Sequence, residues 1–252
     1  MFRPRIIPVL LLKDQGLVKS VKFKNYNYIG DPINAVRIYN ELKADELVFL
    51  DILATKENRT MPLELIKDIG EEANMPFAVG GGIQTVESIQ EIIKAGAEKV
   101  VINSYAVENP DFIKEASEMF GSSTITVCID VKKNLFGKAS VYLQSENKST
   151  NLSPKDFAQL MEEKGAGEII IQSVDKDGTM KGYDLDLIKQ ISEAVSIPVV
   201  ALGGAKDIQD LKKAYHTAYA SAMAAGSMFV YLGTKKGVLI NYPEREEIQS
   251  FV

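Results

Sequence analysis

The feature that most constrains this chain is an internal repeat that relates its first half to its second. Residues 31–51, DPINAVRIYNELKADELVFLD, align without a gap on residues 153–173, SPKDFAQLMEEKGAGEIIIQS. Each copy opens with a residue suited to capping a helix, followed by a proline suited to the first helical position. Three further pairs recur at matching places: RIIPVLLLK with TITVCIDVK, MPFAVGGGI with IPVVALGGA, and AGAEKVVINS with AYASAMAAGS. The sequence therefore predicts a fold made of two similar halves.

Short apolar, β-branched runs alternate with amphipathic helical stretches along the whole chain. Continuous apolar strands separated by helices are typical of a parallel sheet covered on its faces. Eight strand–helix units in 252 residues predict an α/β fold, a (β/α)8 TIM barrel. We predict one domain over residues 1–252, with half-barrels at about 1–120 and 121–235 and a C-terminal tail at 236–252. The strands are expected at residues 5–11, 46–51, 76–80, 99–103, 124–130, 168–173, 198–202 and 220–224.

One stretch departs from this alternation. Residues 133–153 follow the fifth predicted strand, and the alternating pattern of residues 138–144 predicts a small β-hairpin on the active-site face, with residues 145–151 as its polar loop. No other substantial irregularity is expected before residue 229. Beyond that residue the chain matches a long final helix poorly, so the eighth unit is predicted to be abbreviated.

Charge and cysteine content exclude several classes of protein. The net charge of −5 and the sequence pI of about 5.2 leave no basic surface for nucleic acid or anionic membrane. The single cysteine, Cys128, excludes an internal disulfide and fits a reducing compartment. The N-terminal apolar run IIPVLLL is too short for a signal peptide or a membrane span. We predict a cytoplasmic protein with no cofactor, no metal and no nucleic-acid or membrane partner.

Glycine-rich turns follow several of the predicted strands, and the repeat arranges them in two related sets. In a TIM barrel such turns lie at the active-site face, where backbone N–H groups can reach phosphate oxygens. The glycines could also serve only as tight connections. Because two related sets occur, we predict two phosphate sites on opposite sides of the barrel mouth. Their binding residues are expected to be Gly82, Asn103 and Ser104 in the first set, and Asp177, Gly178, Gly204, Ala225, Gly226 and Ser227 in the second.

Asp130 is the residue with the most obvious capacity for chemistry. A carboxylate at the tip of the fifth strand can act as a general acid or base, although it could also cap a loop or pair with Lys132. His216, the only histidine, is expected on an outer helix. Cys128 is expected to pack in the core, because no histidine partner for a nucleophile is evident. No metal-ligand cluster with suitable spacing occurs in the sequence.

Four charged residues mark the opposite ends of the strands. Two are basic and two are acidic: Arg5, Glu46, Lys99 and Glu168. Charges at the closed end of a barrel normally stabilise the fold through mutual salt bridges. From the residue types alone we expect such a network.

In combination, these motifs resemble the HisF family, the cyclase subunits of imidazole glycerol phosphate synthase. The resemblance runs from about residue 3 to residue 229 and is carried by RIIPVL, GDP, DELVFLDI, PFAVGGGI, GAEKVVINS, AVENP, DKDGT and GGA. It implies a duplicated barrel, a substrate with two phosphates, and ammonia supplied by a HisH-like glutaminase docked on the bottom face. The family's gate at the ammonia entrance resembles the four charges, so Arg5, Glu46, Lys99 and Glu168 are expected to open and close an ammonia passage.

The same resemblance exposes a gap in the catalytic set. The family uses two aspartates, at the ends of strands one and five. The second matches Asp130, whereas the first falls on Leu11, which is also the repeat partner of Asp130. Lys19, on the loop after strand one, is retained; Gln172 stands where threonine is usual, and Gly226 where a phosphate-binding serine is usual. Leucine transfers no proton, so cyclase chemistry is expected to be impaired.

The chain further resembles a HisF-like subgroup associated with glycosyl amidation, of the WbuZ type, in RPRIIP, LVKSVKF, GDPINAVRIYNE and VLINYP. That resemblance implies a barrel that passes ammonia on for amidination of a bacterial surface or flagellar sugar, with a sugar amidotransferase as a further partner. The alternative is a genuine cyclase of histidine biosynthesis, in which Asp14, Asp51 or Asp175 replaces the missing aspartate. An isomerase of the HisA type is less favoured, because it also needs the first-strand aspartate and has no ammonia gate.

Overall fold

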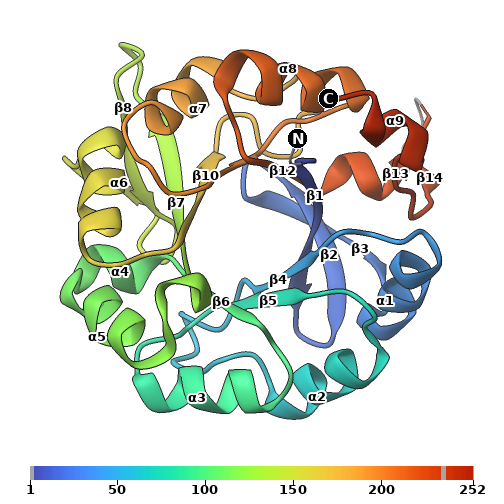
Figure 1. The fold of residues 1–252 in the computed structure, drawn as a ribbon, viewed down its shortest axis with the longest axis horizontal. Coiled ribbons are helices and arrows are strands. Elements are labelled where there is room, and N and C mark those ends of the chain that lie inside the picture. The colour runs from blue at the N-terminus through green and yellow to red at the C-terminus, as the bar shows by residue number, and fades with distance from the viewer. Residues whose placement is uncertain (1–2, 234–236, 252) are drawn as a thin grey trace.

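The computed structural model describes residues 3–233 and 237–251, and in it eight parallel strands close into a barrel (Figure 1). Neighbouring strands follow the order β10, β11, β12, β1, β4, β5, β6 and β7, and β7 pairs with β10 to complete the ring. This confirms the predicted (β/α)8 TIM barrel. The strands are β1 Arg5–Lys13, β4 Leu47–Asp51, β5 Phe77–Gly80, β6 Lys99–Ile102, β7 Ile125–Lys133, β10 Glu168–Ser173, β11 Val199–Leu202 and β12 Ala222–Ala225.

Helices surround the strands on the outside of the ring (Figure 1). The repeated capping signals act as predicted: the Asp31 side chain accepts a hydrogen bond from Asn34 N, and the Ser153 side chain accepts one from Asp156 N. The proline that follows each cap takes the first helical position. The helices are α1 Pro32–Glu41, α2 Leu63–Glu72, α3 Val86–Lys94, α4 Ser104–Glu108, α5 Asp111–Phe120, α6 Pro154–Glu163, α7 Leu185–Ser192 and α8 Ile208–Ala218, with a 3₁₀ turn η1 at Ser122–Thr124.

Two apolar cores follow from the alternation of side chains along the strands. One lies between the strands and the helices, where Ile125, Val127 and Ile129 of β7 are buried. The other fills the inside of the barrel, and it includes Ile7, Val9, Val48, Ala78, Val101, Cys128, Ile170, Val200, Ala222 and Ala224. Cys128 thus packs in the core as predicted, and His216 lies exposed on α8 as predicted.

Two hairpins extend the barrel at its active-site end. The predicted one is present as β8 Ala139–Leu143, which pairs with β7, and β9 Lys148–Ser149, which lies inside the expected polar loop. The expectation of a single irregularity is wrong, because β2 Gly16–Val21 and β3 Lys24–Gly30 form a second hairpin against β1. Lys19 therefore belongs to a strand rather than to a loop. The β2–β3 hairpin was not predicted because β3 is mostly exposed and polar.

The eighth unit is abbreviated, as predicted. After β12 the chain forms a 3₁₀ turn, η2 Ser227–Phe229, a short pair of strands, β13 Tyr231–Leu232 and β14 Gly237–Val238, and the five-residue helix α9 Arg245–Gln249. The predicted boundary between the second half-barrel and the tail, at residues 235 and 236, lies outside the described residues. Within residues 3–233 and 237–251, no helix has the length and apolar character needed to cross a membrane.

Candidate functional site

A cavity of about 180 Å³ opens where the barrel strands end. Its walls combine apolar side chains of the barrel with polar residues from the strand tips, and the β2–β3 hairpin adds Phe23 and Tyr26. The sequence-predicted residues Leu11, Asn103 and Asp130 all face this cavity. Residues from distant parts of the chain meet here because parallel strands all end on the same face.

Asp130 is the buried carboxyl group of the cavity. Asn103 Nδ2 donates a hydrogen bond to Asp130 Oδ2 at 3.0 Å, and Cys128 Sγ lies 3.9 Å from Oδ1. Burial raises the pKa of Asp130 to about 7; the hydrogen bond from Asn103 opposes this shift, and the nearby charge of Asp177 adds to it. A carboxyl group with a pKa near neutrality can both donate and accept a proton, as general acid–base catalysis requires.

Leu11 occupies the equivalent place on β1. It is paired in register with Leu50 of β4 and with Val18 of β2, and its side chain lines the same cavity as Asp130. The position therefore contributes an apolar wall where the repeat places a carboxylate in the other half. No proton transfer can occur at this side chain.

The three aspartates considered as replacements are placed differently. Asp51 accepts hydrogen bonds from Leu53 N and Ala54 N and pairs with Arg59, at 2.5 Å from Nη1, so its oxygens are engaged in the loop after β4. Asp175 accepts a hydrogen bond from the backbone N–H of Lys133, the last residue of β7, at 2.9 Å. Asp14 lies exposed in the turn between β1 and β2. Of the three, Asp51 lines the central cavity together with Leu11 and Asp130, whereas Asp14 and Asp175 are not among its lining residues.

Asp177 is a second buried carboxylate at this end of the barrel, and its charge raises the pKa of Asp130. It accepts hydrogen bonds from Ser20 Oγ at 3.1 Å and from Gln172 Nε2 at 3.5 Å, and burial raises its pKa. Lys19 is fully buried beside it and donates a hydrogen bond to Val9 O. Burial lowers the pKa of Lys19 to about 8, and the charge of Asp177 opposes that shift. Sequence analysis missed this network because it depends on the unpredicted β2–β3 hairpin.

The first set of glycine-rich turns forms a small pocket that is continuous with the central cavity. This first glycine pocket, about 30 Å³, is lined by Thr55 and by residues 81–84 and 101–105, and it shares Thr55, Gly81, Val101, Asn103 and Ser104 with the cavity. Gly82 has φ +68°, and a Cβ there would lie 1.8 Å from Arg59 O. Close backbone packing thus already requires glycine at this position. We predict that this pocket holds a small anion.

The second set forms a separate pocket. This second glycine pocket, about 20 Å³, is lined by Asp177, Gly178, Met180, Leu202–Ala205 and Ala225–Ser227, and it shares no lining residue with the central cavity. The β2 strand packs against it: a Cβ on Gly178 would lie 2.0 Å from Ser20 O, and one on Gly226 would lie 2.7 Å from Lys19 Nζ. The hairpin therefore covers this side of the mouth.

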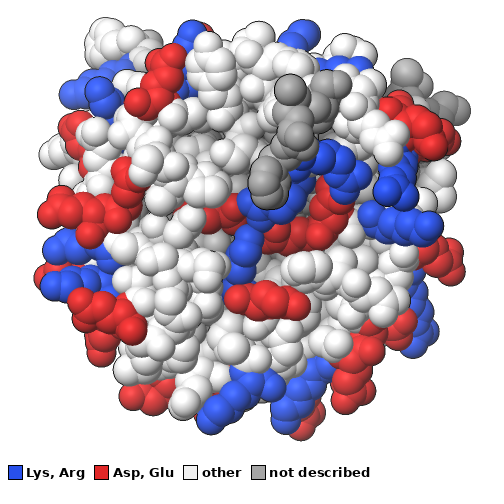
Figure 2. Space-filling view, viewed as in Figure 1, with Lys and Arg blue, Asp and Glu red and all other residues white. Residues whose placement is uncertain are grey.

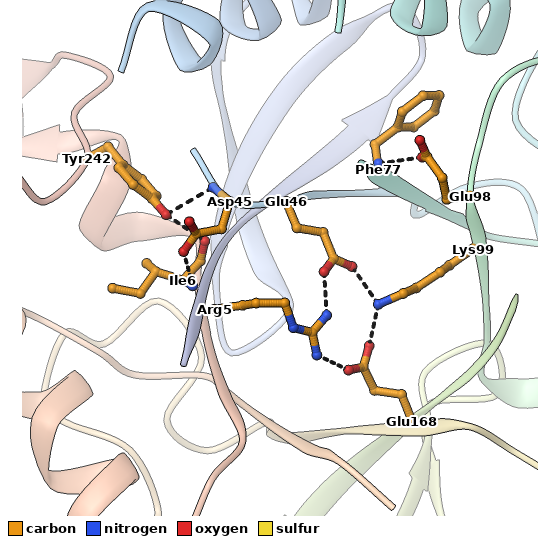
Figure 3. Close-up of polar contacts among 9 residues, drawn as sticks. All are labelled: Arg5, Ile6, Asp45, Glu46, Phe77, Glu98, Lys99, Glu168 and Tyr242. Carbon is orange, nitrogen blue, oxygen red and sulfur yellow. Dashed lines mark hydrogen bonds and ion pairs between the residues drawn. The ribbon is translucent and has the colours of Figure 1, made fainter. Parts of the chain in front are cut away.

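At the opposite end of the barrel, the four predicted charges form a closed ring (Figure 3). Arg5 pairs with both Glu46 and Glu168, and Lys99 Nζ lies 3.1 Å from Glu46 Oε1 and 3.1 Å from Glu168 Oε2. Each of the four carboxylate oxygens thus contacts one of the two cations. Burial alone would lower the pKa of Arg5, but Glu168 and Glu46 outweigh it and leave the pKa raised. We call these four residues the charged ring.

The charged ring lies at the centre of the face on which the strands begin. In the space-filling view, acidic and basic side chains meet in the middle of this face (Figure 2). Beside the ring, Tyr242 fastens the C-terminal segment to β1, because its hydroxyl donates to Ile6 O at 2.9 Å and accepts from Asp45 N at 3.2 Å (Figure 3). The predicted salt-bridge network is therefore present, and it spans the opening of the barrel.

No group of three His, Cys, Asp or Glu side chains is arranged to hold a metal ion in the part of the chain that the structure describes.

Comparison with known proteins agrees with this geometry. The family model described as "Histidine biosynthesis protein" matches residues 5–235. A Leptospira interrogans protein named "Putative imidazole glycerol phosphate synthase subunit HisF" is 44% identical over 98% of both chains. The chain belongs to the HisF family. A Pseudomonas aeruginosa relative named "Putative imidazole glycerol phosphate synthase subunit hisF2" is 45% identical over 97% of both chains. An Alkaliphilus metalliredigens relative named "Imidazole glycerol phosphate synthase subunit HisF" is 45% identical over 92% of both chains.

Proposed function

We propose that this chain is the ammonia-receiving subunit of a glutamine-dependent enzyme complex. A HisH-like glutaminase would dock on the face that carries the charged ring, and ammonia would cross the ring into the barrel. The observation that carries the proposal is the closed ring itself, which spans the barrel entrance with two cations and two carboxylates. The names of relatives, which are synthase subunits, support a role as one part of a complex.

The inside of the barrel suits a neutral passenger. Behind the charged ring, the inward-facing side chains are almost all apolar, and a charged ion would lose its hydration there without compensation. Ammonia in its neutral form loses far less. A ring of ion pairs can exclude water and ions when closed and admit a small neutral molecule when one side chain swings aside. In this proposal Lys99 would be the moving part, because its flexible four-carbon side chain reaches both carboxylates and is partly exposed.

We further propose that ammonia is passed on rather than consumed in an efficient cyclisation. Leu11 removes one of the two carboxylates on which the family's acid–base chemistry depends, and the loss of one such group lowers a rate by about 10²–10⁴. The first glycine pocket would still hold a small phosphorylated ligand beside Asp130. Following the WbuZ resemblance, the final acceptor would be a sugar amidotransferase acting on a surface or flagellar sugar.

The second candidate is a cyclase of histidine biosynthesis. Two observations favour it: relatives are named imidazole glycerol phosphate synthase subunits, and Asp130 keeps a pKa of about 7 next to a second carboxylate, Asp177. In that case the second carboxylate would come from Asp51, which lines the central cavity with Asp130, or from Asp177, whose charge acts on Asp130.

Docking can be tested with glutamine and the HisH-like glutaminase encoded nearest to this chain. The proposal expects a stable complex, stimulated glutaminase activity, and loss of binding when the entrance face is altered by Arg3→Glu, a residue beside but outside the ring that pairs with Asp45. The matched control is Lys138→Glu, on the β7–β8 hairpin at the other end of the barrel, which should bind normally. Binding that is lost in the control but not in Arg3→Glu would contradict the assignment of the docking face.

A further inference from the structure

We propose that the hydroxyl group of Thr126 is a binding point for neutral ammonia, placed between the charged ring and the apolar inside of the barrel. The inference rests on the proposed function for its biological meaning, but the hydroxyl's environment stands independently. Thr126 is only 1% exposed, and its Oγ1 has no hydrogen-bond partner. Among the described residues, only Ser192 Oγ shares this condition. A buried hydroxyl without a partner is costly, and it calls for a ligand or another function.

The register of the strands fixes where this hydroxyl lies. Cys128 of β7 belongs to the core inside the barrel, so Thr126, two residues earlier, faces inward as well. Thr126 is the register partner of Glu168 on β10 and of Val101 on β6. Its side chain therefore adjoins the charged ring on one side and the apolar core on the other.

This location suits a molecule that leaves a polar region for an apolar one. Ammonia that crosses the ring gives up hydrogen bonds, and the next side chains inward include Ile7, Val48 and Val101, which offer none. The Thr126 hydroxyl can donate a hydrogen bond to the ammonia lone pair, or accept a hydrogen bond from an ammonia N–H. One hydrogen bond at this step lowers the barrier to entry.

The charge balance of the ring favours the neutral molecule over ammonium. All four carboxylate oxygens of Glu46 and Glu168 already contact Arg5 or Lys99. An ammonium ion at Thr126 would find no free carboxylate, and desolvating it there would be costly. Water offers the same hydrogen bonds as ammonia, so the test must separate the two.

The first test uses ammonia alone as the probe and needs no partner protein. Threonine methyl groups are labelled with ¹³C, the Thr126 signal is assigned with T126V, and ammonium chloride is added at about pH 10 and at about pH 7, with sodium chloride in parallel. We expect the Thr126 methyl shift to move and saturate only with ammonium chloride at the higher pH, while the exposed Thr85 and Thr217 serve as references. A Thr126 shift that stays fixed, or that follows sodium chloride equally, shows that ammonia does not bind there and overturns the proposal.

The second test measures delivery in the complex with glutaminase. T126V keeps the shape of the side chain and removes the hydroxyl. We expect it to lower the rate at which ammonia released from glutamine reaches the acceptor by about three- to tenfold, the effect of one lost hydrogen bond. T126S restores transfer, S192A changes nothing, and glutamine hydrolysis is unaffected. Equal transfer by T126V and the unaltered chain refutes the inference. If the unaltered chain binds no glutaminase, the proposed function fails, and the methyl titration alone decides whether Thr126 binds ammonia.

Discussion

Neutralising Glu168 tests whether the charged ring behaves as one network. The variant Glu168→Gln keeps the shape of the side chain but leaves Arg5 and Lys99 facing the single carboxylate of Glu46. The Glu168 side chain is 8% exposed, whereas those of Arg5 and Lys99 are 33% and 21% exposed. Breaking a fully buried pair costs about 3–5 kcal/mol, and an exposed pair contributes at most about 1 kcal/mol. For this partly exposed ring we expect a loss of about 1–3 kcal/mol.

Urea unfolding followed by circular dichroism measures this loss. The midpoint should fall while the slope with denaturant stays unchanged, since the same surface is exposed on unfolding. The matched control is Asp111→Asn, which removes an exposed carboxylate that lies 2.6 Å from Lys164 Nζ and should change the midpoint little. Combining Glu168→Gln with Arg5→Met should cost less than the sum of the single effects, because both act on one network. Strict additivity, or a midpoint no lower than that of the control, would refute the idea of a coupled ring.

Three further predictions concern the active-site end. Asp130→Asn should make the chain more stable than the unaltered protein above about pH 7. The pKa of Asp130 is raised to about 7 in the folded state, compared with about 4 in the unfolded chain. The stability that this group contributes when protonated is therefore fully present below about pH 4 and is lost as the pH rises through 7. Urea midpoints at pH 4 and pH 8 test this, and a constant difference between the two proteins would contradict it. Gly178→Ala should destabilise by about 2–4 kcal/mol, because its Cβ would lie 2.0 Å from Ser20 O at φ +65°, whereas Gly226→Ala meets only the flexible end of Lys19 and should cost less than about 1 kcal/mol. The opposite order in thermal melts would show that the hairpin does not pack as described. Leu11→Asp should raise ammonia-driven cyclisation of the histidine-pathway ribonucleotide by about 10²-fold or more if Asp130 retains its role, and a rate unchanged from the parent would place the block elsewhere.

The barrel could be predicted from the sequence because the repeat doubles each signal. The eighth strand, predicted at residues 220–224, is weak by itself but recurs as the match to AGAEKVVINS, and β12 is found at Ala222–Ala225. Caps at Asp31 and Ser153 worked because they are local and depend on a few neighbouring atoms. The charged ring was predictable as a set because all four residues stand where strands begin, and parallel strands begin on one face.

The remaining features depend on contacts between distant segments. The β2–β3 hairpin is stabilised by hydrogen bonds to Asp177, which Lys22 N makes to its backbone oxygen at 3.0 Å and Ser20 Oγ makes to its side chain. The pattern of apolar and polar residues in β3 does not predict these contacts. The same hairpin packs against the second glycine pocket, which shares no lining residue with the central cavity, and the two phosphate sites stay a prediction. The unpaired hydroxyl of Thr126 follows from register and packing, and one threonine in an apolar strand gives no signal.

We propose that this HisF-family barrel handles ammonia without being an efficient cyclase. The most direct measurement is turnover of the histidine-pathway ribonucleotide by the purified chain with saturating ammonium salt, beside an ordinary cyclase subunit of the family. With Leu11 in place of the first carboxylate, the account predicts a rate lower by about 10²-fold or more. A rate within a few-fold of the ordinary cyclase would contradict it.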